Sequence, residues 1–281
     1  LPLYEAKMVH QFDHRFGTYE GQSQAQANQG KLPELDDAAH ADPGRLTLPR
    51  YWVHQDEVTE RLDDLWDRGW LLGWRDITRA SDARTVIASI VPRAAFGDTF
   101  LLSVPSAEPQ TVASLYGNLS SMAFDYCARQ KVAGTHLKYF TMRQLPAFGP
   151  ETYSAPAPWA PSMRIRDWLL PRVLELTYTA WNLKPFAEDC GEDGPPFAWD
   201  PDRRFRLRCE IDAAFLHLYG VSRDDADYIL DTFPVIARSE TREHGEYRTK
   251  LTVLAIYDAL AAAATGGVPY ESPLGVPRRA T

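Results

Sequence analysis

The sequence is poor in cysteine and lacks the common short motifs for nucleotide binding and nucleophilic catalysis. Its 281 residues include three cysteines, Cys127, Cys190 and Cys209. An odd number of widely spaced cysteines predicts free thiols rather than a disulfide framework. None of them forms a metal-type pair. No Gly-x-Gly-x-x-Gly loop, Walker A loop, Gly-x-Ser-x-Gly elbow or kinase signature occurs, so nucleotide binding and serine-type hydrolysis have no support.

Long apolar runs are also missing. No run approaches the roughly 20 residues that a membrane span requires, and the first residues lack the charged-then-apolar order of a signal peptide. Together with the free thiols, this predicts a cytoplasmic protein without a membrane partner. The chain begins at Leu1 and not at methionine, so we expect a processed product or a fragment of a longer protein.

Positive charge is scarce overall but unevenly placed. The formal net charge is −8, with 44% hydrophobic and 24% charged residues, a composition typical of a globular protein. An acidic balance argues against a generic nucleic-acid binder. However, residues 75–143 hold eight Arg and Lys against five Asp and Glu, a net charge of +3, whereas residues 188–231 hold five against twelve, a net charge of −7. Two faces with different partners are therefore expected.

The periodicity predicts an α+β protein with two domains. Residues 1–150 mix strand-like and helical patterns, interrupted by a long polar loop at 21–50. The prolines between Tyr153 and Pro161 predict a stiff linker at 151–163. Residues 164–281 show helical patterns and predict an all-helical C-terminal domain. At this length either one large or two ordinary domains bury a sizeable core.

The first half has recognisable element patterns. The apolar runs 86–91 and 99–104 predict a hairpin or neighbouring strands, and the pattern at 139–142 predicts a further strand. Helical spacing predicts helices over 55–67, with Val58, Leu62 and Leu65 on one face, and over 112–126.

The second half carries helix signals with caps. Leu169, Val173, Leu176 and Ala180 mark one helix. Asp200 as N-cap before Pro201 opens another that ends at Gly220. Ser222 has the capping pattern of a third start, and the last helix is expected over 245–264.

The run from Ala128 to Arg143 is the strongest functional candidate. It gathers Arg129, Gln130, Lys131, Thr135, His136 and Lys138 around a Gly134-Thr135 turn. Arg, Lys and Gln side chains reach phosphates and purine edges in DNA. Arg75 and Arg79 add positive charge nearby in sequence. The alternative is an ordinary surface turn with flanking basic residues, which is common in globular proteins.

Two histidines, His10 and His14, have the i, i+4 spacing of metal ligands but lack the glutamate that follows the first histidine in zincins. A polar face beside DNA or at a domain junction fits them better. Glu5-Ala-Lys7 matches the end of a nuclease metal site without the preceding acidic ligand. The acidic clusters at 188–193 and 224–227 lack the ligand order of a calcium loop. We therefore expect no metal ion.

Several longer blocks resemble one family of enzymes. They are Tyr4 to Tyr19, Gly73-Trp-Arg-Asp-Ile77, Ala128 to His136, Arg208 to Gly220, Tyr228 to Pro234 and Gly245 to Lys250. Together they resemble the C-terminal region of large adenine-N6 DNA methyltransferases, the type IIG restriction-modification enzymes and their relatives in BREX and DISARM phage-defence systems. The resemblance covers nearly the whole chain, except the 21–44 loop and about the last dozen residues.

The resemblance implies a division of labour. In the family this region holds the target-recognition domain and follows a methyltransferase domain that carries the Asn-Pro-Pro-Tyr and S-adenosylmethionine motifs. Neither motif occurs here, because the only Pro-Pro, Pro195-Pro196, lies between Gly194 and Phe197. The segment itself would need no cofactor, and S-adenosylmethionine would belong to the upstream domain.

The sequence thus predicts contacts to double-stranded DNA without catalytic residues. The expected contacts are Arg129, Gln130, Lys131, Thr135, His136 and Lys138, with Arg75, Arg79, Lys7 and His14 as weaker candidates. The acidic helical part would dock on the methyltransferase domain or on another defence-system subunit. The alternative is a non-catalytic protein-interaction module that makes no direct DNA contact.

Overall fold

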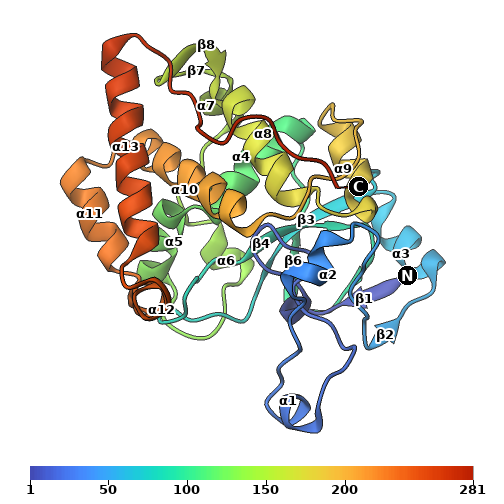
Figure 1. The fold of residues 1–281 in the computed structure, drawn as a ribbon. Helices are drawn as coiled ribbons and strands as arrows, with labels where there is room; N and C mark the ends of the chain where they lie inside the picture. The colour runs from blue at the N-terminus through green and yellow to red at the C-terminus, as the bar shows by residue number, and fades with distance from the viewer. Residues whose placement is uncertain (281) are drawn as a thin grey trace.

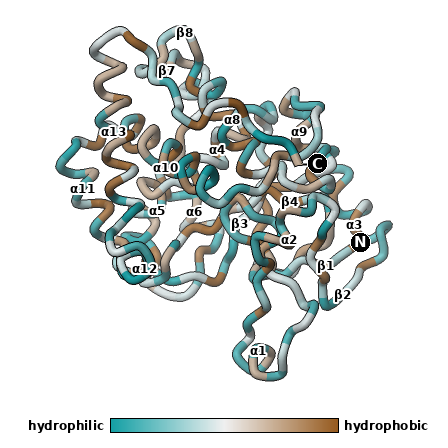
Figure 2. Tube along the Cα trace, viewed as in Figure 1, coloured by the Kyte–Doolittle hydropathy of each residue, from teal (hydrophilic) through white to brown (hydrophobic). Residues whose placement is uncertain are grey.

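A computed structural model describes residues 1–280 and confirms the α+β class. Three small sheets lie among many helices (Figure 1). The brown, hydrophobic segments of the chain gather at β3, β4 and α8, whereas α12 on the outside is largely teal (Figure 2). No helix in residues 1–280 is both long and apolar enough to cross a bilayer.

The central sheet has the strand order β4-β3-β6 and is antiparallel throughout. Its strands are β3 (Trp70–Arg75), β4 (Ala88–Pro92) and β6 (Phe100–Ser103). The two predicted strands exist, but they are not neighbours as expected, because β3 lies between them. β3 takes the middle because five of its six residues are buried, as befits a strand covered on both faces.

The second sheet, β2-β1-β5, is built from the short strands β1 (Pro2–Tyr4), β2 (Tyr51–Trp52) and β5 (Ala95–Phe96). Between β1 and β2 the chain forms η1 (Ala6–Met8) and then the polar 21–50 segment, with only the short helices α1 (Gln24–Asn28) and α2 (Asp37–Ala41). This segment protrudes from the body of the molecule, as α1 shows (Figure 1). It is largely exposed, as its composition predicts.

Two helix predictions and one strand prediction in the first half need correction. α3 (Gln55–Leu62) ends before Leu65, whose side chain is 64% exposed. The helix expected over 112–126 is two helices, α4 (Pro109–Ser120) and α5 (Met122–Lys131), because Ser121 is extended and caps α5 through the Phe124 amide. Residues 139–142 form the helical turn α6 (Tyr139–Met142), not a strand.

The turn at 139–142 has a physical reason. Tyr139 packs edge-on against Trp74, with ring centroids 5.1 Å apart. Its hydroxyl also donates to the Leu102 carbonyl at 2.9 Å. These tertiary contacts hold Tyr139 beside the sheet and outweigh the strand propensity of four residues.

The predicted proline linker folds as part of the body. It contains α7 (Pro150–Ser154) and the hairpin of β7 (Pro156–Ala157) with β8 (Ala160–Arg164). Tyr153 and Trp159 are each only 1% exposed and belong to one hydrophobic core that includes residues from both sides of the segment. The segment is therefore not a free linker, and the division into two domains stays a prediction.

The C-terminal half consists of packed helices, as predicted. They are α8 (Ile165–Thr177), η2 (Trp181–Leu183), α9 (Lys184–Asp189), α10 (Pro201–Leu218), α11 (Arg223–Asp231), α12 (Pro234–His244) and α13 (Arg248–Gly266). Asp200 and Ser222 cap α10 and α11 by accepting from the amides of Arg203 and Asp225. The sequence missed α12, which ends at Gly245 in the left-handed conformation (φ 82°), so the last helix begins three residues later than expected.

Candidate nucleic-acid interface

Two loops far apart in sequence are joined at the surface. The Thr78 amide donates to the Thr135 carbonyl at 3.1 Å, and the Leu137 amide donates to the Asp76 carbonyl at 2.7 Å. Ile77 and His136 also form an isolated β-bridge. These bonds bring Arg79 next to the 131–138 loop. We call the resulting surface the basic ridge, made of Arg79, Gln130, Lys131, Thr135, His136 and Lys138.

The basic ridge has one buried counter-charge. Asp76 is 2% exposed, and its Oδ2 accepts from Lys138 Nζ at 2.7 Å and from His136 Nδ1 at 2.8 Å. The side chains of His136 and Lys138 nevertheless remain 52% and 45% exposed. Arg79, Gln130, Lys131 and Thr135 are exposed. Asp76 therefore orients the Lys138 ammonium and the His136 imidazole at the surface and partly neutralises the charge of Lys138.

Arg129 does not point outward with its neighbours. Its side chain is 8% exposed and lies 3.3 Å from the buried carboxylate of Asp125. It donates to the carbonyls of Asp82 and Ala83 at 2.6 and 2.9 Å, and its Cζ lies 4.1 Å from the centre of the Phe233 ring. The guanidinium thus ties α5 to the 79–85 loop and to the start of α12. The expectation that it lies with the loop's other cations is wrong.

Arg75 and His14 also lie inside the fold, contrary to the surface positions expected for DNA contacts. Arg75 Nε donates to the Val9 carbonyl at 2.8 Å, and burial lowers the pKa of Arg75 to about 10. His14 is 2% exposed, and its Nε2 lies 2.8 Å from Asn182 Oδ1. Burial, followed by the charge of Arg15, lowers the pKa of His14 to about 3, so this imidazole is neutral. It lies where the N-terminal segment meets η2.

Lys7 remains partly exposed, at 34%, but is engaged locally. Its ammonium lies 3.3 Å from a carboxylate oxygen of Glu5 and 5.0 Å from the centre of the Tyr19 ring. Glu5 also accepts a 2.5 Å hydrogen bond from the Tyr19 hydroxyl. The Glu5-Ala-Lys7 motif therefore belongs to a small surface cluster.

Exposed apolar side chains border the basic ridge. Phe140 is 69% exposed, Ile77 is 56% exposed and Tyr139 is 43% exposed. Phe140 follows Lys138 and Tyr139 directly, and Ile77 pairs with His136. Sequence reasoning missed this patch because it assigned 139–142 to a strand, in which alternate residues would be buried.

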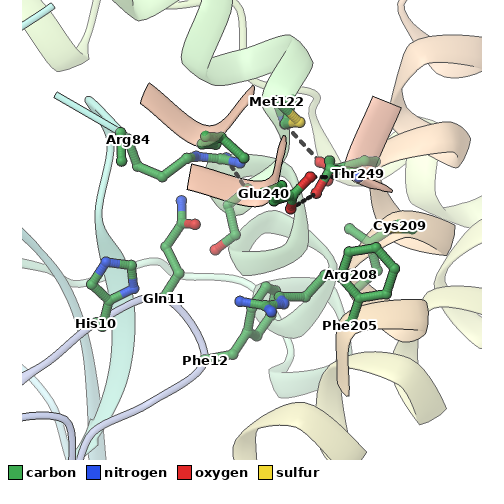
Figure 3. Close-up of a pocket in the computed structure, with 15 residues that line it drawn as sticks. His10, Gln11, Phe12, Arg84, Met122, Phe205, Arg208, Cys209, Glu240 and Thr249 are labelled. Carbon is green, nitrogen blue, oxygen red and sulfur yellow. Dashed lines mark hydrogen bonds between the residues drawn. The ribbon is translucent and has the colours of Figure 1, made fainter. Parts of the chain in front are cut away.

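A pocket of about 240 Å³ lies where the 10–12 segment, Arg84, α10 and α12 meet (Figure 3). Arg84 and Arg208 both extend into it from different elements, and Gln11 and Glu240 flank them. His10 also lines the pocket, and burial, followed by the charge of Arg75, lowers its pKa to about 3. Cys209 is 2% exposed, and burial raises the pKa of its thiol far above the usual range, so it is not a nucleophile.

The histidine pair does not share a site. His14 contacts Asn182, whereas His10 lies against the Phe16 ring at 4.9 Å and lines the pocket. Within residues 1–280, no group of three or more His, Cys, Asp or Glu side chains is arranged to hold a metal ion.

The pocket does not suit S-adenosylmethionine. Its volume of about 240 Å³ is below the range typical of sites for drug-sized ligands. In addition, the guanidinium groups of Arg84 and Arg208 would repel the sulfonium cation. The residues that line the pocket therefore do not fit S-adenosylmethionine, and we derive no methyl transfer at this pocket.

Comparison with known proteins gives no relative. No family model matches the sequence, no curated protein matches it, and no solved structure matches its fold.

Proposed function

We propose that this chain is the DNA-binding, target-recognition segment of a site-specific adenine-N6 DNA methyltransferase of a restriction-modification or phage-defence system. The observation that carries the proposal is the basic ridge. Two hydrogen-bonded loops gather exposed Arg79, Lys131, His136 and Lys138 on one surface of a protein whose net charge is −8. Such a local concentration of positive charge is the footprint of a phosphate-binding surface.

In this proposal the ridge residues have two kinds of role. Arg79, Lys131 and Lys138 contact phosphates and set the register of the protein on the duplex. Gln130 and Thr135 supply hydrogen-bonding groups for base edges, since an amide side chain pairs with adenine in the major groove. Methyl transfer from S-adenosylmethionine belongs to an upstream domain. The acidic helices face that domain or another subunit, because DNA would repel them. The free cysteines favour a cytoplasmic location.

Salt-dependent DNA binding tests the proposal. Fluorescence anisotropy with a labelled duplex should show binding that weakens steeply between about 50 and 200 mM salt. Replacing Arg79, Lys131 or Lys138 by Ala should lower the log–log salt slope by about 0.9 for every phosphate that the variant no longer neutralises. Arg164→Ala, an exposed arginine on β8, is the matched control and should leave the slope unchanged. Absence of binding at low salt, or equal slopes in all variants, would reject the proposal.

The apolar patch favours a second candidate, a protein-interaction module. Ile77, Tyr139 and Phe140 expose more apolar surface than a ridge of phosphate contacts requires, and aromatic residues are enriched at protein interfaces. A DNA-binding ridge uses such groups for stacking or as wedges between base steps. Phe140→Ser distinguishes the two. Under the DNA proposal, Phe140→Ser weakens duplex binding. Under the alternative, neither the wild type nor any variant binds DNA, and Phe140→Ser abolishes capture of the methyltransferase domain.

A further inference from the structure

Arg208 is exposed, lines the pocket and has no partner, whereas the buried arginines Arg15 and Arg204 are closely engaged. Arg15 donates to the carbonyls of His40, Asp42 and Arg45 at 2.8 to 3.0 Å. Arg204 donates to the carbonyls of Phe12 and Leu176 at 2.9 and 2.7 Å. Within residues 1–280, no hydrogen bond or ion pair forms at the Arg208 guanidinium, which is exposed to the pocket. A guanidinium has five donors in a fork that matches an oxyanion.

A second guanidinium faces the same space. Arg84 is 11% exposed and holds the Ser120 carbonyl at 2.5 Å, but its Nε has no hydrogen-bond partner and lies 3.6 Å from an Asp125 oxygen. Figure 3 shows Arg84 reaching into the pocket from one side and Arg208 from α10. The pocket is therefore lined by two guanidinium groups, and that of Arg208 has unused donor capacity.

The carboxylates of the pocket are already occupied. Glu240 accepts from the Thr249 amide at 2.7 Å and from the Thr249 hydroxyl at 2.5 Å. Asp212 accepts from the Met122 amide at 2.7 Å. Burial raises the pKa of Asp212 to about 6, a value still below neutral pH, so this carboxylate stays largely ionised there. Both carboxylates therefore already accept hydrogen bonds from neighbouring residues.

We infer that this pocket binds a phosphate group between Arg84 and Arg208. Charge-assisted, bidentate hydrogen bonds to such a group would satisfy the free fork of Arg208. The volume of about 240 Å³ admits a small anion or the end of a larger ligand. The inference does not rest on the proposed DNA function, because inorganic phosphate alone is a sufficient probe.

The phosphate has two possible sources. It is either a free small-molecule phosphate or a phosphate of the DNA backbone. Ala83, which lines the pocket, belongs to the loop that Arg129 ties to the basic ridge, so a duplex on the ridge would pass nearby. Arg208→Gln measured against both ligands separates the sources.

Thermal unfolding with inorganic phosphate tests the inference. At matched ionic strength, phosphate but not chloride should raise the Tm of the wild-type chain and of the control Arg164→Gln by a few degrees, and should leave Arg208→Gln unmoved. Without phosphate, Arg208→Gln should melt at the same temperature as the wild type or higher, because it removes a charge that has no partner. Equal responses in all three proteins, or no response in any, would overturn the inference. If Arg208→Gln loses duplex affinity as well, the backbone is the source; if duplex affinity is unchanged, the ligand is a small molecule.

A measurement on the unaltered chain guards against misfolding of the variant. Phenylglyoxal modifies accessible arginines, and mass spectrometry of the peptide containing Arg208 reports the extent. Phosphate should slow modification of Arg208 several-fold and leave that of Arg164 unchanged. Equal rates at Arg208 with and without phosphate would also overturn the inference.

Discussion

Replacement of Arg129 separates a structural role from a DNA contact. The sequence places Arg129 among the DNA-contacting residues, whereas the structure gives it a structural role between α5, the 79–85 loop and Phe233. Arg129→Ala removes charge-assisted bonds to three carbonyls and a cation–π contact with Phe233. It also takes one cation from the buried carboxylate of Asp125. We therefore expect Arg129→Ala to destabilise the fold and to have no specific effect on DNA binding.

The size of this destabilisation follows from the contacts that Asp125 keeps in Arg129→Ala. Removing one partner of a buried ion pair costs about 3–5 kcal/mol. Asp125 keeps the amides of Thr85 and Val86, at 2.9 and 2.5 Å, and Arg84 at 3.6 Å. The destabilisation should therefore lie near the lower end, at about 3 kcal/mol. At about 2–4 °C for each kcal/mol in a chain of this size, the Tm should fall by about 6–12 °C.

Urea unfolding gives the free-energy change, and duplex anisotropy well below the Tm gives the affinity. Lys131→Ala, two residues along the chain and exposed, is the matched comparison. It should change stability by no more than about 0.5 kcal/mol but reduce the salt slope by about 0.9. An Arg129→Ala protein with native stability and no DNA affinity would refute this reasoning.

Two further predictions concern packing and protonation. Gly73→Ala should lower the free energy of unfolding in urea by about 1–3 kcal/mol or more, because the added Cβ would lie 2.6 Å from the Leu101 carbonyl oxygen. The control Gly134→Ala should leave stability unchanged, because its added Cβ meets nothing within 4 Å. Equal stabilities of the two variants would contradict the central position of β3. For His14, the folded pKa of about 3 lies below the usual value of 6.5, so its contribution to stability is complete above pH 6.5 and is lost as pH falls, by about 1.4 kcal/mol per pH unit. His14→Gln should flatten this loss between pH 6.5 and 5, whereas His54→Gln, with a side chain 77% exposed, should not; identical slopes in both variants would show that His14 is not buried and neutral.

Local signals in the sequence predicted local structure well. Asp200 with Pro201 and Ser222 fixed two helix starts, since a cap needs only residues next to it in the chain. The two strands around 88–92 and 100–103 were also predicted, but their pairing was wrong because the order of strands depends on which run is buried on both faces.

The site was harder to predict, because charge in a sequence does not reveal direction. Arg129 and Lys131 look equivalent in the sequence, yet one contacts Phe233, more than a hundred residues later, and the other faces solvent. Likewise, nothing local marks Arg208 as the unpaired member of the run Arg203 to Arg208. The surroundings of the Arg208 side chain are set by Arg84 and by α12, and the sequence did not predict α12.

Several contacts of the 12–15 segment can form only late in synthesis, because their partners lie far along the chain. The Phe12 carbonyl accepts from Arg204, 192 residues later, the Arg15 guanidinium donates to the Thr179 carbonyl, 164 residues later, and His14 bonds to Asn182, 168 residues later. At about 5–20 residues per second, a ribosome takes roughly 10–40 s to make that much chain. During this interval these three contacts cannot form, although Arg15 already has the carbonyls of His40, Asp42 and Arg45 as partners. The 12–15 segment therefore completes its native contacts only after the chain beyond Thr179 has been made.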